Sequence, residues 1–173
     1  VSVVVYRTMS GTTPIGKPSL EAILAVAQGW FEKEVLVTAP AKLNLRLKVE
    51  GRRSDGYHLL SMLNCSTSLA DSLRLALTLS TDIAVSVEPQ GALGDGGGEN
   101  LFSKAFKAFW SVFGFDSVPC GLRCEIEKKI PIGGGLGGGS SDAAAVLRYL
   151  EGIFVEVLSK DCDLSSDQVR ARI

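Results

Sequence analysis

The chain has 173 residues, which is enough for one domain with its own hydrophobic core. Its formal net charge is −1 at pH 7 and 46% of its residues are hydrophobic, so composition favours neither a nucleic-acid-binding protein nor a membrane protein. Four scattered cysteines and a single histidine argue against a metal site of the zinc type, and we expect reduced, packed thiols in a cytosolic compartment.

The first half of the chain predicts one helix followed by strands. The helix is expected over residues 18–34, where apolar side chains recur at helical spacing. Alternating apolar residues predict a strand over 43–49, and residues 51–56 form a polar turn. Further strands are expected over 62–68, 73–79 and 83–87.

The second half predicts two helices around one strand. A glycine-rich loop over 89–98 precedes a helix over 100–113, whose stripe of four phenylalanines is typical of core packing. A strand over 122–130 and an alanine-rich helix over 141–150 follow. Alternating strands placed before and between helices indicate an α+β domain, with a largely antiparallel sheet that carries helices on one face.

A run of glycines joins that last strand to the last helix. It covers residues 131–142, and six of these twelve residues are glycines. Backbone amides without side chains beside them can approach a ligand closely. The start of the following helix adds free N–H groups and the positive end of the helix dipole. This arrangement predicts a phosphate-binding loop.

Other interpretations of the run are weaker. Gly133, Gly135 and Gly138 fit the G-x-G-x-x-G pattern of dinucleotide-binding folds, but the preceding strand alternates with charged residues instead of being continuously apolar. Asp161 or Asp163 could be the acid of that pattern, but no second strand clearly precedes either. The sequence also lacks the Gly-Lys-Ser/Thr of a Walker loop, and flexible linkers rarely join a strand to a helix in this way.

Polar residues beside the run add to the phosphate hypothesis. Ser140 and Ser141 can cap the helix or contact phosphate and Mg²⁺, and Asp142 can favour the helix dipole or help hold the metal. Far upstream, Lys42 and Asn44 flank a leucine, so they point to the same face of a strand.

Next to the polar turn, Tyr57 and His58 could stack on a flat base and hydrogen-bond to it. A lone lysine on a strand is more often a solvated charge, and a lone histidine is more often structural. The residues alone leave both alternatives open.

Four segments in this order resemble the motifs of the GHMP small-molecule kinases: residues 40–45, 51–58, 99–101 and 131–141. The second segment resembles the branch that phosphorylates a cytidine diphosphate conjugate of methylerythritol in non-mevalonate isoprenoid (terpenoid) biosynthesis. The resemblance covers about residues 35–150. It implies the family's N-terminal fold, which is ribosomal protein S5 domain 2-like, and the use of ATP and Mg²⁺. It also implies a small-molecule substrate and a cytoplasmic location, or a plastid location in a eukaryote.

The resemblance also implies roles for individual residues. Lys42 corresponds to the catalytic lysine that polarises the attacking hydroxyl, and Asn44 helps to bind substrate. Tyr57 stacks on the cytosine and His58 hydrogen-bonds to the base edge, while Asn100 either touches the nucleotide or caps a helix. The ATP phosphates are assigned to eleven consecutive residues: Pro131, Ile132, Gly133, Gly134, Gly135, Leu136, Gly137, Gly138, Gly139, Ser140 and Ser141.

The chain also departs from the family. We expect residues 1–34 to be an N-terminal extension with a helix, residues 35–173 to be the ATP-binding domain, and the C-terminal GHMP domain to be absent. The family's general base, an aspartate in a Gly-Ala-Asp-x-Pro segment, has no counterpart in these 173 residues. The chain by itself is therefore expected to be inactive. A non-catalytic nucleotide-binding module and another GHMP kinase with a different substrate remain alternatives.

Overall fold

The structure is a computed structural model that describes residues 18–90, 100–161 and 165–170. Its elements follow one another as four strands interspersed with four helices: α1 (Leu20–Gln28), β1 (Val35–Arg52), β2 (His58–Thr78), β3 (Ile83–Glu88), α2 (Leu101–Val112), β4 (Gly121–Glu127), α3 (Gly138–Asp161) and α4 (Ser166–Arg170).

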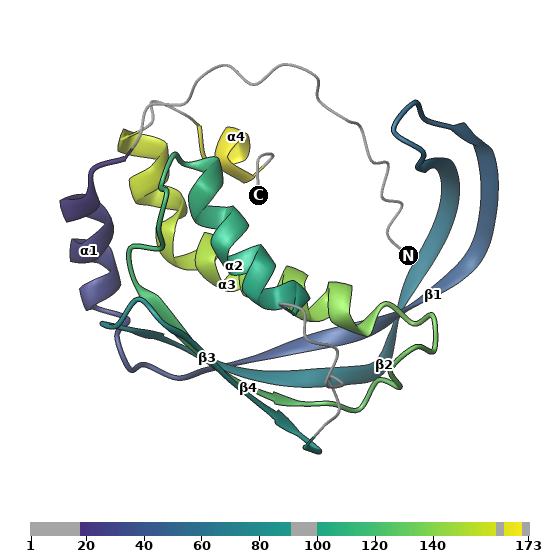
Figure 1. Ribbon diagram of the computed structural model, residues 1–173, viewed down its shortest axis with the longest axis horizontal. Helices are drawn as coiled ribbons and strands as arrows, with labels where there is room; N and C mark the ends of the chain where they lie inside the picture. The colour runs from purple at the N-terminus through teal and green to yellow at the C-terminus, as the bar shows by residue number, and fades with distance from the viewer. Residues whose placement is uncertain (1–17, 91–99, 162–164, 171–173) are drawn as a thin grey trace.

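The strands form one mixed sheet in the order β1-β2-β4-β3. β2 pairs antiparallel with both β1 and β4, and β3 pairs parallel with β4 across the α2 connection. Figure 1 shows α2 and α3 lying across one face of the sheet, with α1 and α4 on the same side. The predicted α+β class, with a largely antiparallel sheet and helices on one face, is confirmed.

The core lies between the sheet and the helices. Phe102, Phe106, Phe109 and Phe113 of the predicted stripe are each at most 2% exposed. α2 begins at its N-cap Asn100, whose Oδ1 accepts a hydrogen bond from the Ser103 N–H at 2.8 Å. The cap role proposed for Asn100 is therefore present.

The strands predicted in the first half of the chain are shorter than those in the structure, whereas the strand predicted over 122–130 is longer than β4, which ends at Glu127. Residues 62–68 and 73–79, expected as two strands, belong to the single strand β2, and β1 begins eight residues before the predicted 43–49. The β1–β2 register is irregular near residues 41, 45 and 50. Such bulges shift the alternation of side chains between the two faces, which hides the continuity of a strand from a pattern of period two.

Two helices also have bounds that differ from the sequence prediction. α1 ends at Gln28 instead of residue 34, because Gly29 is its C-cap and Glu32 adopts a left-handed φ of 58°. α3 begins at Gly138 and continues to Asp161, well past the predicted end at residue 150. Buried side chains continue along this extension at helical spacing: Ile153, Phe154 and Leu158.

The helix predicted before residue 34 packs into the same core as the rest of the chain. Ile23 and Ala27 of α1 are fully buried, and the Ser19 N–H donates to Asp161 Oδ2 of α3 at 3.0 Å. The domain boundary at residue 34 stays a prediction. Cys65, Cys120 and Cys124 are free thiols, while Cys162, Asp163 and Glu99 lie outside the described residues. Within the described ranges, none of the helices combines the length and apolarity that a membrane crossing requires.

Candidate functional site

The glycine run forms a tight loop between β4 and α3. Gly133, Gly135 and Gly137 have φ values of 75°, 71° and 71°, in the left-handed region that other residues rarely adopt. Left-handed residues at alternate positions are typical of backbone turns that gather N–H groups around an anion. The loop borders a cavity of about 150 Å³, whose lining consists of Lys128 and residues 130–139.

Helix α3 begins inside the run. Its first hydrogen bond joins the Ser141 N–H to the Gly137 carbonyl at 2.9 Å. The residue before the helix is a glycine and has no side chain to cap the first N–H groups, and within the described residues α3 has no side-chain N-cap. Free N–H groups at a helix N-terminus are suited to hold phosphate. Ser140 and Ser141, predicted at the helix start, lie within the first turn instead.

The loop packs closely against three neighbouring elements. A methyl group added at Gly137 would lie 3.3 Å from Lys42 Cε of β1. At Gly138 it would lie 3.1 Å from Ile130 Cγ2, beyond the end of β4, and at Gly139 it would lie 3.3 Å from Leu101 Cδ1 of α2. Close packing therefore adds a second reason for glycine at Gly137, and is the reason at Gly138 and Gly139, where φ is not left-handed.

The structure brings Lys42 and Asn44 to this loop. The Lys42 backbone N–H donates to the Leu136 carbonyl at 2.9 Å, which ties β1 to the middle of the loop. The Lys42 ammonium donates to Asn44 Oδ1 at 3.1 Å, so the two side chains share one face, as their spacing predicts. A cation beside a helix N-terminus favours an anionic ligand at this position.

Tyr57 and His58 lie at the other end of the β1–β2 hairpin. His58 pairs with Arg52 in the last position of the register, and Tyr57 is 74% exposed in the turn. The hairpin projects beyond the helices and curves toward their side of the sheet (Figure 1). The structure therefore does not place these two side chains against the loop.

A buried charged network beneath the loop was not foreseen. The Lys128 ammonium donates to Asp71 Oδ2 at 2.5 Å and to Asp142 Oδ2 at 2.8 Å. The three side chains are 5%, 0% and 3% exposed, respectively. Asp142, proposed as a metal ligand or a charge for the helix dipole, is thus ion-paired inside the protein.

The pKa values of the two carboxyl groups shift in opposite directions. Burial by itself would raise the pKa of Asp71, but the Ile130 N–H and the Lys128 ammonium hold that pKa below its ordinary value. For Asp142, burial raises the pKa and Lys128 offsets only part of the effect. Asp142 Oδ1 is buried and has no partner among the described residues. Asp142 is therefore the less readily ionised carboxyl of the two.

A signal for this network was present in the sequence. Asp71 continues the buried face of Leu73, Leu75 and Leu77, and Lys128 continues that of Leu122, Cys124 and Ile126. Charged residues on the apolar faces of two strands indicate a buried pair once the strands are known to be neighbours.

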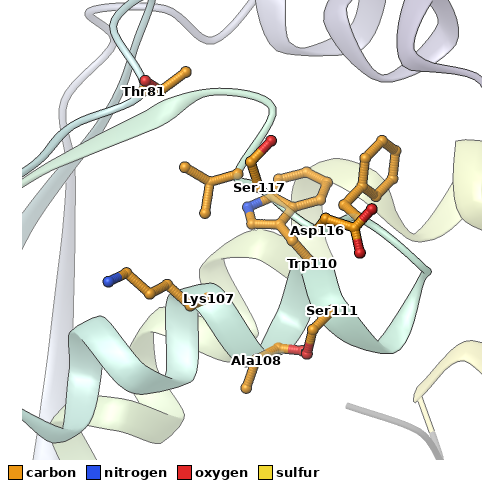
Figure 2. Close-up of a pocket in the computed structure, with 9 residues that line it drawn as sticks. Thr81, Lys107, Ala108, Trp110, Ser111, Asp116 and Ser117 are labelled. Carbon is orange, nitrogen blue, oxygen red and sulfur yellow. The ribbon is translucent and has the colours of Figure 1, made fainter.

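A larger hollow of about 470 Å³ lies at the other end of α2. Lys107, Trp110 and Ser111 of the helix line it together with Thr81, Asp116 and Ser117, and Figure 2 shows the Trp110 ring beside Asp116 and Ser117. None of the predicted site residues borders it. Since α2 meets the glycine loop through Leu101, at its first turn, the hollow is separated from the loop by most of the helix.

Comparison with known proteins gives one family and consistent relatives. The family described as GHMP kinases N terminal domain matches residues 100–170, which include the glycine loop. A protein from Synechococcus sp. (strain CC9902), named 4-diphosphocytidyl-2-C-methyl-D-erythritol kinase, is 43% identical over 118 residues, covering 68% of this chain and 37% of that protein. One of the same name from Citrifermentans bemidjiense is 44% identical over 115 residues, covering 66% and 39%.

A solved structure agrees with these relatives. The crystal structure of 4-(cytidine 5'-diphospho)-2C-methyl-D-erythritol kinase superposes with a TM-score of 0.52 at 37% identity, over 73% of this chain and 46% of that one. The chain thus spans less than half the length of the curated relatives and the solved structure described here.

Proposed function

This chain belongs to the GHMP kinases through their N-terminal domain, and from that premise we propose that it is the ATP-binding part of a kinase acting on a cytidine diphosphate conjugate of methylerythritol. The whole protein would transfer a phosphoryl group from ATP to a hydroxyl of that conjugate. The step would serve non-mevalonate isoprenoid biosynthesis. The name shared by the relatives at 43% and 44% identity supports this choice of substrate over those of other GHMP kinases.

One observation carries the proposal. The glycine loop runs directly into the uncapped N-terminus of α3, and Lys42 lies against it through the close contact at Gly137. Phosphoryl transfer depends mainly on positioning and charge neutralisation, and this arrangement offers both. ATP, when bound, supplies the phosphoryl group. The loop N–H groups would hold its phosphates, and the Lys42 ammonium would offset the charge that develops between the attacking hydroxyl and the transferred group.

We also propose how the remaining ligands are held. The Ser140 and Ser141 hydroxyls, in the first turn of α3, fit a Mg²⁺ ion that arrives with the nucleotide, because Mg²⁺ prefers oxygen ligands and is often bound through substrate phosphates. The described residues contain no preformed cluster of acidic, histidine or cysteine side chains for a metal. Tyr57 and His58 would bind the cytosine from the hairpin. We propose a cytoplasmic location, or a plastid location in a eukaryote, where ATP and the cytidine diphosphate conjugate would both be available.

The test compares two lysines of the same strand. Lys42→Ala removes the cation beside the loop, and Lys48→Ala removes an exposed cation that pairs with Glu50 farther along β1. We expect isothermal titration of Mg-ATP into the chain to show binding that is weakened on the order of tenfold by Lys42→Ala and little changed by Lys48→Ala.

Turnover is measured on a chimera in which the C-terminal half of a curated relative completes the chain. In that protein Lys42→Ala should reduce kcat by on the order of 100-fold, because charge stabilisation in the transition state is lost. Absence of Mg-ATP binding by the unmodified chain would refute the proposal. Binding without turnover in the chimera would favour a non-catalytic nucleotide-binding module, and indifference to CMP as a competitor would exclude the cytosine site.

A further inference from the structure

We propose that Asp71, Lys128 and Asp142 form a positioning unit that fixes both ends of the glycine loop in its binding geometry before a nucleotide arrives. The unit deepens the proposed function and rests on it, since it acts on the loop that would hold the phosphates. None of the three side chains needs to touch the ligand, because each acts through the loop backbone or through the N-terminal part of α3.

The entry to the loop is held by Asp71. Its Oδ1 accepts hydrogen bonds from the Lys129 N–H at 2.6 Å and the Ile130 N–H at 2.8 Å, the two residues directly before Pro131. Asp71 lies on β2, so these bonds fix the end of β4 against the neighbouring strand. A carboxylate that accepts from two successive N–H groups sets both the position and the direction in which the chain leaves.

The exit from the loop is held by Asp142, through Lys128. Asp142 directly follows the first turn of α3, which ends with Ser140 and Ser141, and its Oδ2 accepts from the Lys128 ammonium at 2.8 Å. The same ammonium donates to Asp71 Oδ2. A methyl group at Gly138 would lie 3.3 Å from Lys128 Nζ, so the ammonium lies directly under the start of the helix.

Between its two ends the loop has little support of its own. Its internal backbone hydrogen bond, from the Gly134 N–H to the Pro131 carbonyl, is long at 3.4 Å, and the bond from Lys42 to Leu136 holds the middle. Glycines gain more backbone freedom on release than any other residue. A loop this rich in glycine is therefore ordered mainly by what holds its ends. If the ends were free, the entropy lost on ordering the loop would reduce the affinity for the nucleotide.

The burial of the network favours a role beyond stability. A buried ion pair often stabilises a fold no better than apolar residues of similar volume, because desolvation of the charges is costly. In place of three apolar side chains, these residues supply directed bonds to two N–H groups and to Asp142, just after the first turn of α3.

The experiment compares neighbouring lysines with equal charge. Lys128→Met removes the buried ammonium, and Lys129→Met removes an exposed one that pairs with Glu127 at 3.1 Å. Affinities for Mg-ATP and for inorganic tripolyphosphate are measured by calorimetry at a temperature where each variant is fully folded. Hydrogen exchange of the amides from Gly133 to Ser141 is measured on the nucleotide-free chain.

We expect Lys128→Met to lower the affinity for both ligands on the order of tenfold. It should also accelerate amide hydrogen exchange across the loop, since the ends are no longer held. Lys129→Met should leave loop exchange unchanged and weaken binding by less than about threefold, because exposed charges contribute little. If both variants lost affinity equally and loop exchange were unchanged, Lys128 would contribute only its charge and the proposal would be overturned. The proposal would also be overturned if neither variant lost affinity.

Two further results keep the test decisive. If Lys128→Met does not fold, Lys128→Arg keeps the charge but alters the geometry, and faster loop exchange in that variant supports the unit whereas unchanged exchange refutes it. If the unmodified chain binds no ATP, the proposed function fails, and the exchange comparison still decides whether the unit orders the loop.

Discussion

Gly135 and Gly138 belong to the same loop, but the structure requires glycine there for different reasons. Gly135 has a φ of 71° and open space around it, so a side chain would fit but the backbone would be strained. At Gly138 the φ is unexceptional, and a methyl group would instead press on Ile130 Cγ2 at 3.1 Å. At these two positions conformation and space act separately, which a sequence of repeated glycines does not distinguish.

Alanine at two glycines should have opposite effects on stability. Gly135→Ala should lower the free energy of unfolding by ~1 kcal/mol, because the left-handed conformation is strained for alanine. Gly152→Ala, in the middle of α3 with no atom near the added methyl group, should raise it by ~0.5–1 kcal/mol. Urea denaturation of both variants measures the two changes. A stabilising Gly135→Ala would contradict the left-handed geometry of the loop.

At the level of elements, the sequence predicted the helices and strands whose patterns depend on neighbouring residues. It missed the features that depend on pairing between strands. The Phe102–Phe113 stripe and the alternation in β3 mark α2 and β3 closely, since each pattern is local. The continuity of β2 was hidden by bulges, whose positions depend on pairing with β1. The Asp71–Lys128 contact needed the knowledge that β2 and β4 are adjacent, which neither strand contains by itself.

The site shows the same division. The contact of Lys42 with Asn44 follows from their spacing along one strand. The start of α3 at Gly138 does not follow from propensity, because glycine is a poor helix residue. The backbone there lies close to Ile130 and Leu101, and such contacts between distant residues are not visible in a local sequence pattern.

Helix α1 should behave as part of the domain core. Ile23→Ala, at a fully buried position, should lower the free energy of unfolding by ~2–5 kcal/mol, because it leaves a cavity. Leu20→Ala is the control on the same helix, since Leu20 is 50% exposed, and it should cost ~1 kcal/mol or less. Thermal or urea unfolding gives both values. Equal, small effects would show that α1 is an appendage and would support a domain boundary at residue 34.

At the scale of the whole molecule, two thiols report on cooperative opening. Burial raises the pKa of both Cys120 and Cys124 to about 12, so neither forms appreciable thiolate in the native protein at pH 8. We expect both to resist a thiol-specific reagent in buffer and to become labelled together over the urea range in which the helices unfold. Peptide mass spectrometry locates the labels. Labelling of either thiol well below that range would reveal local opening of β4 or of the residue directly before it.

Strand β2 also has a consequence for the order in which the chain folds. Its first part pairs with β1 across a short turn, from Arg52↔His58 outward, and this contact closes a very small loop of chain. Its last part pairs with β4, where Ser72 meets Glu127 only after β3 and α2 have been bridged. Closing the longer loop costs more chain entropy. The hairpin is therefore expected to form early, and the sheet beneath the glycine loop to close late.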